Sequence, residues 1–170
     1  MKKILLLLVV AVASLTASAQ IYVGGDLGFW HNDDADKTVF SIAPSVGYEL
    51  SESWAIGGEL KYSWVKDGDQ NMAIAPYARW SFFESGIVRL FADFGFGVAV
   101  TKPDTGDSHT GWAIGARPGI ALKLNDHFSV LAKCGFAGYM DEYASGKTMG
   151  NGFGLDVSGE NLSFGIEYTF

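Results

Sequence analysis

Three histidines and a single cysteine are the side chains of this chain that most readily perform acid–base, nucleophilic or metal chemistry. Asp107, Ser108 and His109 are consecutive and contain the residue types of a Ser–His–Asp hydrolase. Serine and histidine are often adjacent by chance in a polar link, and His31 and His127 lie at the ends of apolar segments. No cluster of His or Cys has the spacing of a metal site. We therefore expect no catalytic residue, no metal site and no cofactor, and the chain is interpreted as a non-enzyme.

Charged residues are the second group that could do chemistry, because they recur at alternate positions within apolar segments. Alternate positions lie on one face of a β-strand, so these side chains would project together into one space. Charges gathered in a narrow space are expected to pair, because an unpaired buried charge is costly. The eleven residues of this predicted charge network are Asp26, Glu49, Glu59, Lys61, Arg79, Arg89, Asp93, Arg117, Lys123, Lys133 and Glu167.

The elements that position these charges are β-strands. An alternation of large apolar with small or charged residues runs through the chain, and strict alternation of this kind predicts strands. From Trp54 to Trp64, for example, one face is wholly apolar and the other carries Glu59 and Lys61. The eight segments span residues 21–31, 39–50, 54–65, 72–83, 87–100, 111–124, 128–140 and 160–170.

The connections between the segments alternate in length. Three are short turns at 51–53, 84–86 and 125–127, and four are longer polar links at about 32–38, 66–71, 101–110 and 141–159. Seven such connections join eight antiparallel strands and leave both chain ends on the short-turn side. The layout predicts an all-β, eight-stranded antiparallel transmembrane β-barrel with both termini in the periplasm.

The first nineteen residues are interpreted as a secretory signal peptide. Met1-Lys2-Lys3 is basic, residues 4–13 have no polar side chain, and Ala17-Ser18-Ala19 fits a cleavage site before Gln20. Residues 20–170 would then form one barrel domain. Without Lys2 and Lys3, ten basic residues stand against 19 acidic ones, a net charge of −9. This charge argues against nucleic acid as a partner.

The alternation with a period of two does not show which face points inward. The volume of the barrel interior indicates which face it is. An eight-stranded barrel has an interior only just wide enough for side chains. The tryptophans and most of the Phe, Ile and Leu residues would overfill it, whereas small residues and paired charges fit. We therefore expect the apolar face to contact lipid and the eleven charges to line a closed lumen. Tyr22, Trp30, Tyr77, Phe91 and Tyr139 would add bulk inside.

Aromatic residues of the apolar face gather near the two ends of the segments, as in the girdles at the two membrane interfaces of outer-membrane barrels. The alternative is that strand ends simply favour aromatic residues. The predicted girdles comprise Trp54, Trp80, Phe82, Phe128, Tyr168 and Phe170 at the short-turn end, and Phe29, Phe40, Trp64 and Trp112 at the other end.

The signal peptide, the eight segments and the final strand together resemble a known family. The final strand carries Leu162, Phe164, Ile166, Tyr168 and Phe170 on one face. The chain resembles the outer membrane protein β-barrel domain family, which includes the small barrels of outer membrane proteins X and W and the membrane domain of A. The resemblance implies location in a Gram-negative outer membrane and an assembly signal at Tyr168 and Phe170 for the barrel-assembly machinery.

One stretch departs from the pattern, since Phe153, Leu155 and Val157 alternate in the opposite phase from Leu162 onward. Either Gly159 marks a bulge or 153–158 belongs to the fourth long link; we favour an upper extension of the last strand. Outside the stretch 153–158, the long links carry nine acids against four lysines. This excess is interpreted as a solvated rim, and shared divalent cations with lipopolysaccharide are the alternative.

The function expected from these features is an integral barrel for envelope structure or surface interaction, with a plugged lumen. A narrow pore for small solutes or ions is the alternative, in which the lumen charges would tune selectivity. A lipid-modifying enzyme is a third possibility. Outer-membrane lipid, lipopolysaccharide and the assembly machinery are the expected partners of a monomer.

Overall fold

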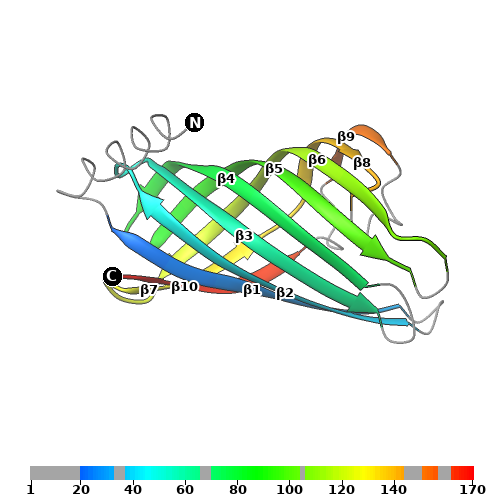
Figure 1. The fold of residues 1–170 in the computed structure, drawn as a ribbon. Coiled ribbons are helices and arrows are strands. Elements are labelled where there is room, and N and C mark those ends of the chain that lie inside the picture. The colour runs from blue at the N-terminus through cyan, green and yellow to red at the C-terminus, as the bar shows by residue number, and fades with distance from the viewer. Residues whose placement is uncertain (1–19, 33–36, 66–69, 104–105, 144–150, 157–161) are drawn as a thin grey trace, which may run out of the picture.

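The chain forms a closed antiparallel β-barrel (Figure 1). A computed structural model describes residues 20–32, 37–65, 70–103, 106–143, 151–156 and 162–170. Within these ranges no helix is long and apolar enough to cross a membrane. The strands are β1 (Ile21–Asn32), β2 (Lys37–Glu49), β3 (Trp54–Val65), β4 (Gln70–Ser85), β5 (Val88–Lys102), β6 (His109–Lys123), β7 (Phe128–Lys133), β8 (Phe136–Asp141), β9 (Gly152–Asp156) and β10 (Ser163–Thr169).

These ten strands build the eight-stranded barrel expected from the sequence. β7 and β8 are two parts of one barrel strand, because both pair with β6. β9 and β10 likewise continue one another, because β9 pairs with β8 and β10 pairs with β7. The barrel closes where β10 pairs with β1, with Tyr22 opposite Thr169 and Leu27 opposite Phe164. The prediction of an eight-stranded antiparallel barrel is confirmed.

The short turns all lie at the end of the barrel that also holds the C-terminus and the start of β1 (Figure 1). Phe170 N–H donates to the carbonyl of Ile21 at this end (3.0 Å). In the β6–β7 turn, the side-chain oxygen of Asn125 accepts hydrogen bonds from the backbone N–H groups of His127 and Phe128. The two-residue turn between β4 and β5 contains Gly86 at φ +58°, a conformation that glycine adopts without strain.

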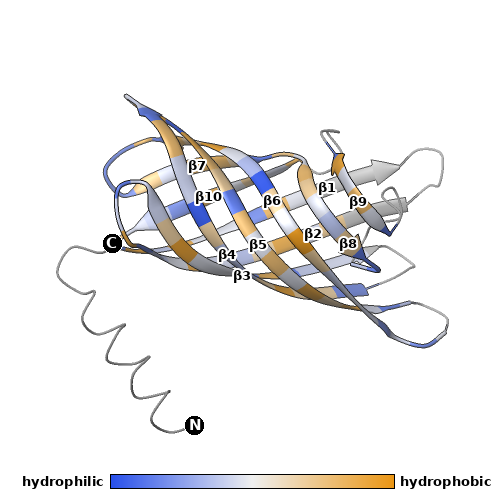
Figure 2. Ribbon diagram, turned by 90° about the horizontal axis from the view of Figure 1, so that it is seen from above, coloured by the Kyte–Doolittle hydropathy of each residue, from blue (hydrophilic) through white to orange (hydrophobic). Residues whose placement is uncertain are grey.

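Hydrophobic and hydrophilic residues alternate along the strands, as the hydropathy colours show (Figure 2). Burial alternates in the same way, for example along β5. On β5, Phe91, Asp93 and Ala99 are buried in the lumen, whereas Phe94 and Phe96 are exposed on the outer wall. The buried set of the whole barrel is mostly small or charged, and the exposed set is large and apolar. The wall is therefore inside out relative to a soluble barrel, and its outer surface suits lipid.

A β-bulge at Cys134 and Gly135 changes the phase of the seventh barrel strand. Gly119 pairs with Lys133, yet Ala116 pairs with Ala137, so this strand contains one residue more than β6 between the two pairs. Gly135 adopts φ +71°. Beyond the bulge, Tyr139 lies on the outer wall and stacks on Trp112 (5.0 Å between ring centroids). The expectation that Tyr139 fills the lumen is wrong, because the extra residue exchanges the two faces.

The bulge also explains the reversed phase of Phe153 and Leu155. β9 pairs Phe153 with Tyr139 and Leu155 with Ala137, so both side chains lie on the outer wall with their partners. Residues 152–156 therefore belong to the upper part of the last barrel strand and not to a free loop. The return to the phase of Leu162 falls in 157–161, which includes Gly159 and lies outside the described residues.

Two prolines interrupt the hydrogen-bonded ladder in the middle of the wall. The pairing of β2 with β3 omits Ala43 and Pro44, and that of β4 with β5 omits Ala75 and Pro76. Proline has no N–H to donate, so it removes a ladder bond wherever it occurs. Pro76 lies beside the outer surface of β5, where it borders a hollow described below.

Replacement of Gly135 by alanine should destabilise the barrel. A side chain at left-handed φ costs about 1–2 kcal/mol, so the free energy of unfolding should fall by that amount in urea titrations of the refolded protein. Gly58→Ala is the matched control, because a Cβ at Gly58 meets nothing within 4 Å. Equal stability of the two variants would show that the bulge does not depend on the glycine.

Candidate functional site: the charged lumen

The structure places the eleven predicted charges at the lumen with different degrees of burial. Glu49, Lys61, Arg117 and Lys123 are partly buried. Lys123 lies at the short-turn end, where it forms an ion pair with Glu84, outside the central group. The seven fully buried members are Asp26, Glu59, Arg79, Arg89, Asp93, Lys133 and Glu167.

Arg79 on β4 is the centre of this lumen network. Its Nε and Nη2 donate to the two carboxylate oxygens of Asp93 on β5, at 2.7 and 3.1 Å. Its Nη1 donates to Glu167 on β10 across the lumen, at 2.7 Å. Arg79 is only 3% exposed. A guanidinium with a two-pronged contact and a third carboxylate contact is held in one orientation, so it links strands that are remote in the sequence.

Two arms extend from Arg79. Toward the short turns, Arg89 donates to the second oxygen of Glu167 (2.9 Å) and to Glu49 (3.3 Å). Toward the long loops, Lys133 Nζ lies 2.9 Å from Asp26 and 3.7 Å from the same Asp93 that binds Arg79. The pairs thus connect β1, β2, β4, β5, β7 and β10 through one continuous set of contacts.

Three aromatic rings surround the Arg79 guanidinium. Its Cζ lies 4.2 Å from the centroid of Phe91, 5.4 Å from Tyr77 and 5.5 Å from Tyr22. Tyr22 and Tyr77 share a hydrogen bond between their hydroxyl groups (3.0 Å). Glycines opposite the rings make room for them, since a Cβ at Gly47 would collide with Tyr22 and one at Gly119 with Phe91. The cation is therefore enclosed by π faces as well as carboxylates.

The central charges balance. Five acids, Asp26, Glu49, Glu59, Asp93 and Glu167, meet the cations Arg79, Arg89, Arg117 and Lys133 in ion pairs. Lys61 is the fifth basic residue of this group, and it lies near Arg117 as well as near Glu59 and Asp26. Charge neutrality reduces the cost of placing ionised groups at buried positions.

Tyr143 is a lumen residue that the sequence pattern did not reveal, because it follows β8 in what was interpreted as a loop. Its ring packs against Ala73 and Ala99 inside the barrel. Burial raises the pKa of the Tyr143 phenol, and nearby Arg117 opposes part of that rise. No periodic signal marks a single loop residue that turns into a lumen.

The candidate catalytic residues do not form a site. Asp107, Ser108 and His109 are all exposed, and no hydrogen bond joins their side chains in the part of the chain that the structure describes. His127 Nδ1 lies 2.8 Å from the carbonyl of Thr169, and its ring stacks on Tyr168, so it supports the turn. Among the described residues no group of three or more His, Cys, Asp or Glu could hold a metal ion. The side chain of His31 lies outside the described residues.

The aromatic residues of the outer wall form contacts with one another at both ends. At the short-turn end Trp54 stacks on Trp80, which also contacts Phe82. Phe128 and Phe170 both pack edge-on against Tyr168. At the other end Phe40 stacks on Trp64 (5.4 Å). The side chain of Phe29 lies outside the described residues.

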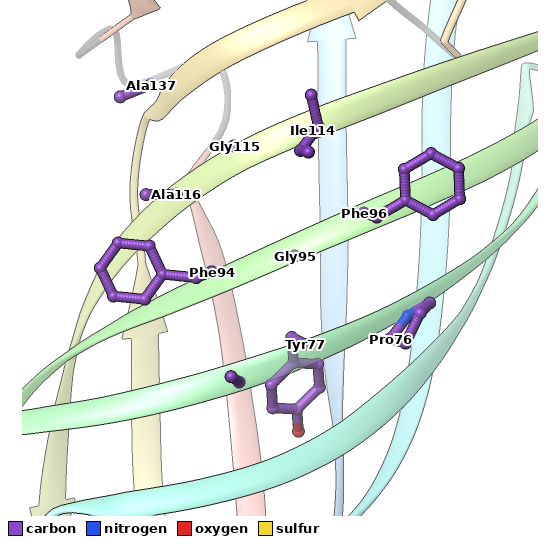
Figure 3. A pocket seen from close by; sticks show the side chains of 10 residues that line it. Pro76, Tyr77, Phe94, Gly95, Phe96, Ile114, Gly115, Ala116 and Ala137 are labelled. Carbon is purple, nitrogen blue, oxygen red and sulfur yellow. The ribbon is translucent and has the colours of Figure 1, made fainter.

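The outer wall contains a hollow of about 640 Å³ between β4, β5, β6 and β8 (Figure 3). Phe94 and Phe96 border it, and the backbone of Gly95 and Gly115 lies between them. It opens to the outside, and none of its lining residues is charged. The hollow lies on the apolar wall, so it offers a surface for lipid contact and no groups for chemistry.

Comparison with known proteins identifies the family. The family model of the outer membrane protein beta-barrel domain matches residues 4–170, so the chain belongs to this family. Barrels of this family belong to outer membranes, which agrees with the apolar outer wall. No curated protein sequence matches the chain.

Solved structures with the same fold are also outer-membrane barrels. The N-terminal β-barrel domain of Pseudomonas aeruginosa OprF superposes with a TM-score of 0.58 at 14% identity, covering 89% of this chain and 97% of that one. Neisserial surface protein A gives 0.56 at 13% identity, with 89% and 97% covered. A major outer membrane protein from Thermus thermophilus gives 0.53 at 14% identity, with 90% and 100% covered. At these identities the likeness is one of fold.

Replacement of Arg79 by methionine should destabilise the barrel strongly. The change leaves Asp93 and Glu167 buried without their main partner, and breaking a buried pair costs about 3–5 kcal/mol. Urea unfolding followed by tryptophan fluorescence measures the loss. Arg79→Lys should restore only part of it, because lysine lacks the planar fork.

The matched control is Lys123→Met, which removes a more exposed pair worth about 1 kcal/mol or less. If Arg79→Met and Lys123→Met lose the same stability, the lumen network is not what holds the barrel together.

Proposed function

We propose that this protein is a non-enzymatic, integral outer-membrane barrel with a sealed lumen that serves envelope structure or surface interaction. The observation that carries the proposal is the balanced network around Arg79, which crosses the lumen from β4 and β5 to β10. A continuous set of ion pairs in a narrow barrel leaves little room for a solute.

A narrow pore for small solutes or ions is the second candidate. The same charges would then select the permeating ion. The short contacts of Arg79 disfavour this candidate, because a solute would have to break buried ion pairs in order to pass. Lipid modification is a weaker candidate still, because the exposed Ser108 and His109 have no shared hydrogen bond to activate a nucleophile.

The setting that we propose is the outer membrane of a Gram-negative bacterium. Residues 1–19, which lie outside the described residues, are proposed as a cleaved signal peptide, and both mature ends would face the periplasm. A monomer would contact membrane lipid through its apolar wall and lipopolysaccharide near the long loops. The proposed lipid interfaces are the two aromatic bands. Most of the loop acids lie in the undescribed links, so their proposed role is only that of a solvated rim.

The refolded chain that starts at Gln20 should produce no channel current in a planar bilayer. Single-channel recording measures it, with the folded state checked by the anomalous gel migration of unheated barrels. A known conducting barrel reconstituted in the same way is the control for insertion. Steady, reproducible openings would refute the sealed lumen and favour the pore.

The exposed C-terminal aromatic residue is proposed as part of the signal read by the barrel-assembly machinery. Phe170→Ala should reduce the amount of folded barrel in the outer membrane of cells and leave refolding in detergent unchanged, because Phe170 is 65% exposed. Phe164→Ala is the matched control, since Phe164 is an equally apolar, exposed residue of the same strand. Equal membrane levels of the two variants would remove the special role of Phe170.

A further inference from the structure

The lumen differs in character above and below its middle. Around Arg79 the ion pairs are short, at 2.7–2.9 Å to Asp93 and Glu167. Toward the long loops the fully buried positions carry uncharged side chains, including Ser63, Ala73, Ala99 and Ala113, and the partly buried Lys61 lies opposite Ala73. The small side chains leave space for another residue in the upper lumen.

Tyr143 occupies this upper lumen. Glu142 precedes it at φ +47°, a left-handed conformation that is unusual for a residue other than glycine, and its N–H donates to the side chain of Asn151 (2.9 Å). This turn directs Tyr143 inward. A Cβ at Gly111 would collide with the carbonyl of Glu142, and one at Gly97 with the ring of Tyr143. The absence of side chains at Gly97 on β5 and Gly111 on β6 thus leaves the space that Tyr143 and the Glu142 carbonyl occupy.

A small chamber lies between Tyr143 and the Arg79 network. Its volume is about 60 Å³, and its lining includes Glu59, Asp93, Arg117 and Tyr143. One ion pair of the lining is long, because Arg117 Nη1 lies 3.8 Å from Glu59. A polar contact longer than about 3.5 Å leaves space for a bridging water. The chamber has room for about two water molecules.

We propose that the lumen is sealed twice, by the Arg79 network below and by Tyr143 at the loop end, and that the chamber between the seals binds water. The proposal rests on the sealed lumen proposed above and adds a second, independent barrier with a hydrated site beneath it. The water would bridge Arg117 to Glu59, while Tyr143 separates that site from the exterior.

Cysteine accessibility tests the outer seal. The background is Cys134→Ala, because Cys134 is exposed on the outer wall. Ala113→Cys and Ala75→Cys place reporters in the chamber on two different strands. Ser108→Cys is an exposed control, and Ala121→Cys lies in the lumen at the level of Arg89 below the inner seal. Each is labelled in the folded barrel with a charged, membrane-impermeant thiol reagent, with and without Tyr143→Ala.

Tyr143→Ala should raise the labelling rate of Ala113→Cys and Ala75→Cys by about tenfold or more, which corresponds to a decrease of at least about 1.4 kcal/mol in the free energy of opening. Ser108→Cys should label rapidly in both backgrounds and Ala121→Cys slowly in both. Tyr143→Phe should keep the chamber protected, because the ring forms the seal. If both chamber reporters label at the same rate with and without the Tyr143→Ala substitution, Tyr143 is not a seal.

Other results would contradict the sealed lumen of the proposed function. Labelling of Ala121→Cys after Tyr143→Ala, or channel openings of that variant, would mean that the Arg79 network does not close the lumen. The hydrated site has its own test, a crystal structure of the refolded barrel. Water oxygens within hydrogen-bond distance of Arg117 and Glu59 are expected, and a chamber without ordered water would overturn that part of the proposal.

Discussion

The structure depends on one constraint, which is that the lumen of an eight-stranded barrel must be filled by side chains that are satisfied inside it. Arg79 meets this constraint with three hydrogen bonds to Asp93 and Glu167 and with the faces of three aromatic rings. Because Glu167 lies on the last strand and Asp93 on the fifth, the same contacts cross the barrel. The interior thus holds together strands that the backbone ladder joins only to their neighbours.

The outer wall follows from the opposite requirement, since lipid offers no partner for polar groups. Large apolar side chains cover it, and aromatic residues stack in pairs such as Trp54 with Trp80 near one end and Phe40 with Trp64 near the other. The wall is not uniform. Pro76 interrupts the β4–β5 ladder, and the glycines beside it leave the hollow between Phe94 and Phe96. These irregularities are local, because the pairing resumes on either side.

The predictions from the sequence succeeded where a property repeats along a strand. The period of two predicted the eight barrel strands, and it gave the boundaries of the first seven within a few residues. It also separated Asp93 and Glu167 from Phe94 and Ile166 without knowledge of the pairing. It failed at Tyr139, because a single extra residue at Gly135 exchanges the two faces and leaves no mark on the pattern itself. The reversed phase of Phe153 and Leu155 was visible, but its cause lay on the neighbouring strand.

The sequence by itself determined the fold class, the identity of the charges inside and, except beyond the bulge at Gly135, the direction of each face. These properties depend on side-chain type at a regular spacing and on the volume of a narrow barrel. Only the tertiary structure decided which charges meet. The choice of Asp93 and Glu167 for Arg79, of Glu84 for Lys123, and the entry of Tyr143 into the upper lumen depend on strand register and on one loop turn. Contacts between residues far apart in the chain have no local pattern, so they appear only when the barrel closes.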